Sequence, residues 1–165
     1  MQANITSVGK FVPDKIISNS EFEKTLNTSN EWIVSRTGIE ERRQLELGKA
    51  SSYMAIKAIE KLFKNSTIHP NDIDVIIVST ITPDMLFPST ACLIQKHFKI
   101  DGCWGFDLSA ACSGFLFGIE TANNLIQSGK YSNIIVVGVD TMSSILDYKD
   151  RNTCILFGDG AGAVL

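Results

Sequence analysis

The sequence predicts a layered α/β fold in which helices pack on a largely parallel sheet. Two observations lead to this prediction. From about residue 49 onwards, stretches with helical spacing alternate with short runs rich in Val and Ile. Those runs are apolar throughout, which is typical of strands buried on both faces, and strands that alternate with helices pair in parallel through right-handed crossovers. The 165 residues are 44% hydrophobic, enough to fill the core of one compact domain over residues 1–165.

The first 48 residues are less regular than the rest. Residues 5–13 are compatible with a strand. Residues 18–21 and 28–31 each have the Ser/Thr-x-x-Glu pattern of a capping box, so we expect a short helix to begin at each of them. Gly38 is placed to end the second helix.

The later elements follow in order. In residues 51–63 apolar side chains recur at helical spacing, and Met54, Ala58 and Leu62 fall on one face. The polar turn at 69–72 ends this helix. We then expect strands at 73–82, 103–110, 133–141 and 154–165, and helices around 91–98 and at 113–129.

Charge and hydropathy exclude several functions. The 15 basic and 18 acidic residues give a formal net charge of −3, and no run of Lys or Arg exceeds a pair, so nucleic acid is not an expected partner. No apolar run reaches the ~18 residues of a membrane span. The N-terminus lacks the basic and apolar regions of a secretory signal, so we expect a cytoplasmic protein with reduced cysteines.

Three of the 4 cysteines, Cys92, Cys103 and Cys154, have apolar neighbours in the sequence and are expected to be buried. No pair has CxxC or CxxH spacing, so the sequence predicts no metal site. The fourth cysteine has a different setting.

Cys112 stands where a predicted strand turns into a predicted helix, within LSAACSGFLFG. Its small neighbours permit a sharp elbow and close approach of a substrate. At a helix N-terminus the positive end of the dipole favours a thiolate, and free backbone N–H groups can receive an oxyanion. The segment therefore favours a nucleophilic cysteine on an elbow like that of serine hydrolases. The alternative is a small apolar thiol that fills a tight strand–helix junction.

A nucleophilic thiol usually needs a base, and the sequence offers 2 histidines, His69 and His97. His69 precedes a proline in a polar turn, and His97 lies among polar residues at a helix end, so both are expected to be solvated. If Cys112 is catalytic, its base is expected to lie outside these residues.

The glycine-rich residues 158–163 (GDGAGA) fit the loosened dinucleotide pattern GxGxx(G/A). That fingerprint needs a strand before it and a helix after it, whereas a strand-like run follows here. We therefore expect a tight bend between two strands, and no NAD or FAD site.

Four segments together resemble the N-terminal half of a β-ketoacyl-acyl carrier protein synthase III, of the thiolase superfamily. They are EWIVSRTGIEER, DMLFPSTACLIQ, the AACSGF elbow and DRNTCILFGDGAGAVL, in register along the whole chain. The elbow alone is shared with chalcone-synthase-like and hydroxymethylglutaryl-synthase-like relatives, and the first segment favours the type III enzyme. The resemblance implies a thiolase-like layered α-β-α fold. These residues would form the N-terminal half of a duplicated architecture, with the C-terminal half absent.

The resemblance further implies a decarboxylating Claisen condensation that initiates fatty-acid synthesis. A short acyl group would pass from coenzyme A to Cys112, and the carbanion of malonyl-acyl carrier protein would then attack the thioester. No cofactor is implied, because the coenzyme A thioester is a substrate. The family's catalytic His and Asn belong to the C-terminal half, and a homodimer is implied.

By the same resemblance, Trp32 and Arg151 would sandwich the adenine of coenzyme A. Thr28, Arg36 and Thr37 would line the same entrance, with Arg36 suited to a phosphate. Without the resemblance, Trp32 would be a half-buried helix anchor and Arg151 a solvated loop charge.

Three more residues match acyl-pocket positions of the family. Phe87 is similar to the residue that crosses the dimer interface to close the partner's acyl pocket, and Met142 and Phe157 match pocket-lining positions. The alternative for all three is ordinary packing.

Two other functions stay open at this point. A relative that makes ketides or hydroxymethylglutaryl-type products would use the same thiolate. A different class is a non-catalytic module that only binds coenzyme A or a partner through these residues.

Overall fold

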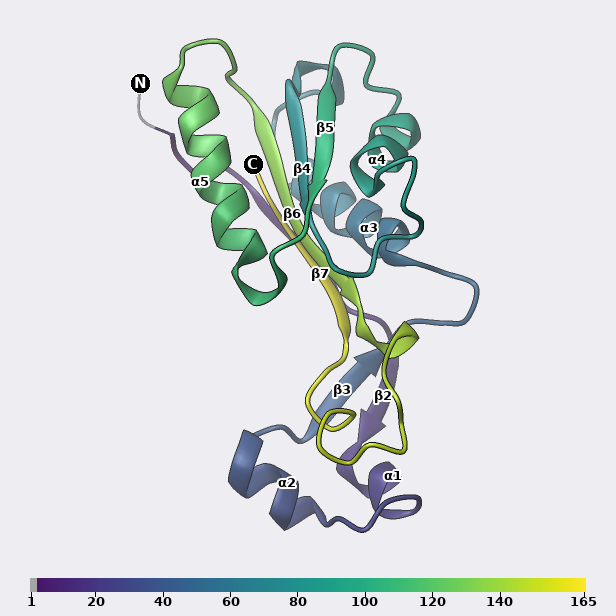
Figure 1. The fold of residues 1–165 in the computed structure, drawn as a ribbon. Helices are drawn as coiled ribbons and strands as arrows, with labels where there is room; N and C mark the ends of the chain where they lie inside the picture. The colour runs from purple at the N-terminus through teal and green to yellow at the C-terminus, as the bar shows by residue number, and fades with distance from the viewer. Residues whose placement is uncertain (1–2) are drawn as a thin grey trace.

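The computed structural model describes residues 3–165 and has two parts, a five-stranded sheet with helices on both faces and a smaller lobe at one end of it (Figure 1). The central strand β4 (Val75–Ser79) pairs in parallel with β5 (Trp104–Leu108) on one side and with β6 (Ile134–Thr141) on the other. Every residue of β4 is buried, as predicted for a strand covered on both faces.

Beyond β6 the sheet becomes antiparallel, whereas strands that alternate with helices are expected to pair in parallel. The strand β7 (Asp159–Val164) pairs antiparallel with β6 and with β1 (Val8–Phe11), and the strand order is β1-β7-β6-β4-β5. The connection explains this difference. Residues 142–158 form a loop instead of a crossover helix, and strands joined without a crossover pair antiparallel.

Three helices cover the sheet, and all three lie where the sequence predicts helices. The helices α3 (Ser51–Lys64) and α4 (Thr90–Phe98) pack on one face, and α5 (Gly114–Gln127) packs on the other (Figure 1). The five-stranded sheet is therefore the middle layer of three, as the predicted α-β-α layering requires.

The alternation of side chains along β4 divides the core in two. Ile76 and Val78 belong to the cluster that includes α3 and α4, whereas Val75 and Ile77 pack with Ala122 of α5. Burying such a side chain contributes roughly 1.5–3 kcal/mol. These positions hold the three layers together and so fix the carboxyl ends of β4 and β6, where the site lies.

The lobe is built from the first part of the chain and appears at the bottom of Figure 1. It contains the antiparallel strands β2 (Lys15–Ser18) and β3 (Glu41–Gln44) and the short helices α1 (Asn19–Glu23) and α2 (Asn30–Thr37). Gly38 ends α2 in the left-handed conformation, with φ 70°, as the sequence predicts.

The core of the lobe includes residues from far along the chain. Phe22 and Ile33 pack with Cys154 and Ile155, which belong to the loop between β6 and β7. This loop therefore leaves the sheet, enters the lobe and returns to the sheet to begin β7.

The predicted capping boxes are wrong in detail although both helices exist. The hydroxyl of Ser18 makes no hydrogen bond to the backbone of α1 and instead lies 2.8 Å from Ser20 Oγ. In α2 the cap is Ser29 and not Thr28, because Ser29 Oγ accepts a hydrogen bond from the backbone N–H of Trp32 at 3.2 Å.

The glycine cluster is also placed differently from the prediction. Residues 159–164 are the strand β7, bonded on both sides, so the cluster is neither a tight bend between strands nor a loop that opens a helix. The predicted strand 154–165 begins late, because residues 151–156 form turns.

Candidate active site

Cys112 lies on a sharp elbow between sheet and helix. The strand β5 ends at Leu108, a single 3-10 turn spans Ala111–Ser113, and α5 begins at Gly114. Ala111 adopts a left-handed conformation, with φ 46°, which costs a residue with a Cβ about 1–2 kcal/mol. Strain of this kind is typical of functional sites, and here it turns Cys112 outward, where it is exposed.

Two glycines let the first turns of α5 approach the sheet closely. A Cβ at Gly114 would lie 3.2 Å from Ser79 Cβ, and one at Gly118 would lie 2.8 Å from Val136 Cγ1. Only glycine permits this spacing without displacement of the helix. The N-terminus of α5, with its unpaired backbone N–H groups and positive dipole end, is thus held directly beside Cys112.

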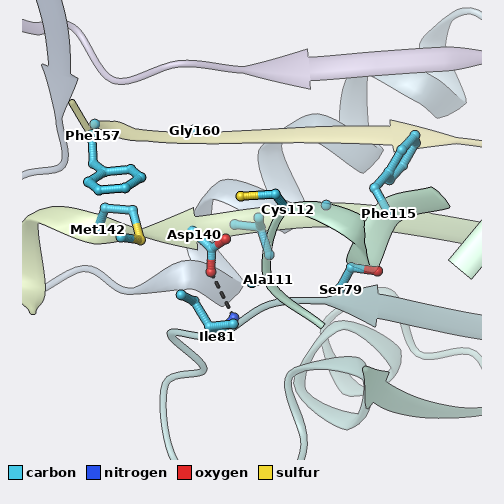
Figure 2. A pocket seen from close by; sticks show the side chains of 12 residues that line it. Ser79, Ile81, Ala111, Cys112, Phe115, Asp140, Met142, Phe157 and Gly160 are labelled. Atoms are coloured by element: carbon cyan, nitrogen blue, oxygen red, sulfur yellow. Dashed lines mark hydrogen bonds between the residues drawn. The ribbon is translucent and has the colours of Figure 1, made fainter. Parts of the chain in front are cut away.

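Cys112 faces a pocket of about 450 Å³ at the carboxyl ends of β4 and β6 (Figure 2). Most of its lining is apolar and comes from the elbow, from β6 and from the loop that follows β6. Met142 and Phe157 are among the lining residues, and their role in binding an acyl group stays a prediction. Phe87 is not among them, because its side chain is 87% exposed on the loop that precedes α4.

Asp140, at the end of β6, is a lining residue that the sequence reasoning missed. Its Oδ1 accepts hydrogen bonds from Thr80 Oγ1 at 3.1 Å, from the backbone N–H of Ile81 at 2.8 Å and from Thr82 Oγ1 at 3.0 Å. The carboxylate therefore holds the loop that follows β4, and the side chain of Ile81 becomes part of the pocket wall.

Asp159, at the start of β7, holds another part of the pocket wall in place. It is 5% exposed and accepts hydrogen bonds from the backbone N–H and hydroxyl of Ser143 at 2.8 and 2.6 Å, and from the backbone N–H of Leu45 at 2.7 Å. Since Met142 directly precedes Ser143, this carboxylate fixes a second part of the wall and joins the lobe to the sheet.

A second cluster of predicted residues gathers in the lobe. The guanidinium carbons of Arg36 and Arg151 lie 4.4 and 4.7 Å from the centre of a Trp32 ring, and Arg151 Nη1 donates to the backbone carbonyl of Asn27 at 2.7 Å. Thr28 directly follows Asn27 in the sequence, and its Oγ1 is buried without a hydrogen-bond partner among residues 3–165.

Thr37 is the member of this set whose hydroxyl is already used within the chain. Its Oγ1 donates to the carbonyl of Ile33 at 2.7 Å and accepts from the N–H of Ile39 at 3.0 Å. The structure thus gives Thr37 a local role at the end of α2. None of the five residues predicted for the coenzyme A entrance lines the Cys112 pocket.

A buried arginine ties the loop between β6 and β7 to the lobe. Arg42 Nε donates to the carbonyl of Ile155 at 2.8 Å, its Nη2 donates to the same carbonyl, and its Nη1 donates to Asn19 Oδ1. Burial lowers the pKa of Arg42, and the nearby Cys154 thiol opposes this shift. By anchoring this loop, Arg42 supports the position of Arg151 over Trp32.

The two histidines lie away from the pocket, as predicted. His69 is exposed and its Nδ1 accepts from the N–H of Asn71 at 3.2 Å. His97 is exposed at the end of α4, with Nε2 4.0 Å from Glu60 Oε1. Neither lines the Cys112 pocket.

The other cysteines differ from Cys112. Burial, with the Asp74 charge as a lesser cause, raises the pKa of Cys103 to about 11, and burial also raises the pKa of Cys154. The prediction that Cys92 is buried is wrong: it lies one position off the buried stripe of α4 and is exposed.

No group of three His, Cys, Asp or Glu side chains in residues 3–165 is close enough to hold a metal ion. In the same residues, every helix is too short or too polar to cross a membrane.

Comparison with known proteins agrees with this fold. The family described as 3-oxoacyl-[acyl-carrier-protein (ACP)] synthase III matches residues 106–165. The β-ketoacyl-[acyl-carrier-protein] synthase III of Chlorobaculum tepidum is 52% identical over 100% of this chain and 50% of that protein, and that of Koribacter versatilis is 49% identical over 99% and 49%. The chain therefore spans about half the length of the curated relatives it matches.

Solved structures also match this chain over about half of their length. The 3-oxoacyl-[acyl-carrier-protein] synthase III from Aquifex aeolicus matches with a TM-score of 0.94 and 44% identity, over 97% of this chain and 52% of that one. The priming β-ketosynthase from the R1128 polyketide biosynthetic pathway matches with a TM-score of 0.94 and 34% identity, over 98% and 48%.

The three layers and the cysteine elbow define a protein of the thiolase-like α/β class. Within this class, the chain belongs to the β-ketoacyl-[acyl-carrier-protein] synthase III family and corresponds to the N-terminal half of its members.

Proposed function

We propose that the full-length protein is a condensing acyltransferase that initiates fatty-acid synthesis through an acyl thioester on Cys112. The observation that carries this proposal is the exposed Cys112 at the N-terminus of α5, facing a largely apolar pocket. In the first step the thiolate forms a C–S bond to the acyl carbonyl, the C–S bond to coenzyme A breaks, and coenzyme A leaves with a proton. Backbone N–H groups at the elbow would hold the developing oxyanion.

In the second step, malonyl-acyl carrier protein would lose carbon dioxide, and its carbanion would attack the Cys112 thioester to give a β-ketoacyl product. The family resemblance assigns stabilisation of the carbanion to a His and an Asn outside these residues. This is consistent with the positions of His69 and His97, neither of which lines the pocket. The thioester itself is the activated substrate, so we propose that the reaction needs no cofactor.

We propose that coenzyme A enters over the lobe, where Trp32 lies beside the exposed Arg36 on α2. Stacking of the adenine between Trp32 and Arg151 would need the two planes about 7 Å apart, twice a van der Waals contact. Arg151 now lies 4.7 Å from the ring centre, so it would move outward by a few ångströms to admit the base. The guanidinium of Arg36 forms no ion pair within residues 3–165, and it suits a phosphate of the same ligand.

We propose a homodimer in which Phe87 reaches the partner's acyl pocket. Two observations support this assignment. Phe87 is 87% exposed on its own chain, although a large aromatic side chain is normally covered. The strand β5 is at an edge of the sheet, with Trp104 40% exposed, and such edges pair readily with another chain. We also propose that the protein acts in the cytoplasm, where a reactive thiol stays reduced.

A priming synthase for ketides is the second candidate, and the match to the R1128 priming β-ketosynthase favours it. The fatty-acid enzyme and the ketide synthase differ in their product and in the malonyl thioester that supplies the added carbons. Product analysis with malonyl-acyl carrier protein and with malonyl-coenzyme A separates them, because the fatty-acid enzyme should form product only from the carrier-protein thioester.

The proposal is tested by Cys112→Ala in the full-length protein, with acetyl-coenzyme A and malonyl-acyl carrier protein as substrates. Loss of the nucleophile should reduce formation of acetoacetyl-acyl carrier protein by at least about 10³-fold, the scale on which a catalytic nucleophile acts. Cys92→Ala is the matched control, since Cys92 is also exposed but lies on α4. Full activity of the Cys112 variant, or equal loss in both, would contradict the proposal.

A further inference from the structure

The pocket beside Cys112 combines apolar walls with one carboxylate. Among the residues that the structure describes, Asp140 is the charged side chain in the lining, and the others are neutral. An acidic group at this place is not needed for thiolate attack on a thioester. It therefore calls for an explanation in terms of what the pocket accepts and rejects.

The two oxygens of Asp140 have different surroundings. Oδ1 accepts the three hydrogen bonds from Thr80, Ile81 and Thr82, whereas no hydrogen bond to Oδ2 is found within residues 3–165. Figure 2 shows the carboxylate in the pocket between Ile81 and Cys112, with the bond to the Ile81 N–H drawn as a dashed line. One oxygen is thus used to fix the side chain, and the other is left to face the contents of the pocket.

The loop that holds Asp140 is itself held firmly. Thr82 Oγ1 also accepts from the N–H of Thr141 at 2.8 Å, and the carbonyl of Thr82 accepts from the buried hydroxyl of Ser51 at 2.6 Å. The carboxylate cannot turn away from the pocket without breaking these bonds. Its negative charge is therefore a fixed part of the pocket wall.

A fixed charge discriminates between acyl groups. A neutral alkyl chain gains by burial against Phe115, Val139 and Met142, and it has no charge for Asp140 to repel. An acyl group that ends in a carboxylate brings a second negative charge into the same partly buried space, where repulsion is stronger than in water. An unfavourable contact of this kind is a common source of specificity.

We propose that Asp140 is a specificity-determining residue that excludes dicarboxylic acyl groups from transfer to Cys112. The inference rests on the proposed acyl transfer and adds to it. In that transfer a C–S bond forms at Cys112, the C–S bond to coenzyme A breaks, and coenzyme A leaves with a proton. With Asp140 in place, the malonyl group does not occupy the nucleophile, and Cys112 is kept for the neutral starter.

The test compares butyryl-coenzyme A with succinyl-coenzyme A, whose acyl groups have the same four-carbon chain and differ in the terminal carboxylate. The rates at which each acylates Cys112 in the full-length protein are followed by mass spectrometry. Asp140→Asn removes the charge but keeps an oxygen that can accept the same hydrogen bonds. We expect it to raise the succinyl-to-butyryl rate ratio by about tenfold or more, the scale of one like-charge contact in a partly buried site.

Asp84→Asn is the matched control. Asp84 accepts hydrogen bonds from Ser52 N and Ser52 Oγ at 2.8 and 2.5 Å, so it holds the same loop, but it does not line the pocket. We expect this variant to leave the ratio unchanged. An unchanged ratio in Asp140→Asn, or an equal rise in both variants, would show a purely structural role and overturn the inference.

A second measurement needs no variant. Succinamoyl-coenzyme A has a neutral terminal amide of the same shape as the succinyl carboxylate, so the unmodified protein should load it about tenfold faster. Equal rates for these two thioesters would also overturn the inference. The proposed function fails in a distinguishable way, because acetyl-coenzyme A would then leave no acyl group on Cys112 at all.

Discussion

At the scale of single residues, Trp32 is contacted by two guanidinium groups that form no ion pair among residues 3–165. A cation–π contact at such an exposed site contributes about 0.5–1 kcal/mol, whereas a base stacked on an aromatic ring contributes about 1–3 kcal/mol. An adenine that displaces Arg151 from the ring therefore gains more than it costs. The two guanidinium groups therefore hold the indole in place until a base displaces Arg151.

Trp32→Ala in the full-length protein should raise KM for acetyl-coenzyme A by about tenfold, because the stacking surface is lost. The value of kcat should change much less, since Trp32 lies outside the Cys112 pocket. Steady-state kinetics measure both. Trp32→Phe keeps an aromatic face and should retain most of the affinity, and an equal KM in all three proteins would place the adenine elsewhere.

The sequence predicted some of these residues and missed others for a physical reason. Cys112 could be singled out because the features of its elbow, a strand end and a helix start, are its neighbours in sequence. Asp140 binds Thr80, 60 residues away, and Arg42 binds Ile155, 113 residues away. A long-range partner leaves no pattern near the residue itself, so these positioning groups became visible only in the fold.

At the scale of elements, the position of α5 depends on how closely it approaches the sheet. A Cβ at Gly118 would lie 2.8 Å from Val136 Cγ1 and 3.2 Å from Ser79 Oγ. Contacts this short leave no room for a larger residue unless the helix moves, and its N-terminus carries the Cys112 elbow.

Gly118→Ala should therefore destabilise the protein despite the better helix propensity of alanine. The propensity gain is about 1 kcal/mol, whereas overpacking a core costs about 1–3 kcal/mol. We expect a net loss of up to about 2 kcal/mol in the free energy of unfolding, measured by urea denaturation. Gly102→Ala is the control, since a Cβ there meets nothing within 4 Å, and a stabilised Gly118 variant would contradict the packing described.

The elements themselves were largely predictable, and their pairing was less so. Apolar runs and helical spacing located β4, β6 and all three large helices. The antiparallel pairing of β7 was not predicted, because the sequence of residues 142–158 does not show whether the segment crosses the sheet to a parallel strand. It could equally lead back to an antiparallel neighbour of β6. The glycine cluster was misread for a related reason: small residues that permit a bend also fit in a strand packed between two neighbours.

At the scale of the whole molecule, one segment joins the two sites. Residues 142–158 begin at the pocket with Met142, place Arg151 over Trp32 in the lobe, and return to the pocket with Phe157. The segment is bonded to the lobe through Arg42 and to the sheet through Asp159. A ligand that moves Arg151 would therefore act on the same segment that forms two walls of the Cys112 pocket.

The division of the molecule also fits its relatives. The chain spans about half the length of the β-ketoacyl-[acyl-carrier-protein] synthase III proteins that it matches, and it holds the proposed nucleophile and the proposed coenzyme A entrance. The base and the second oxyanion site are assigned by resemblance to the other half. In the proposed function, acyl transfer and condensation would therefore draw on different parts of the full-length protein.

The central claim is that Cys112 carries the acyl group. Its most direct test is tandem mass spectrometry of the full-length protein after incubation with acetyl-coenzyme A alone, with all cysteine-containing peptides sequenced. We predict one acetyl group, on the peptide that contains Cys112 and on its sulfur. An unmodified Cys112, or an acetyl group on Cys92 instead, would contradict the claim.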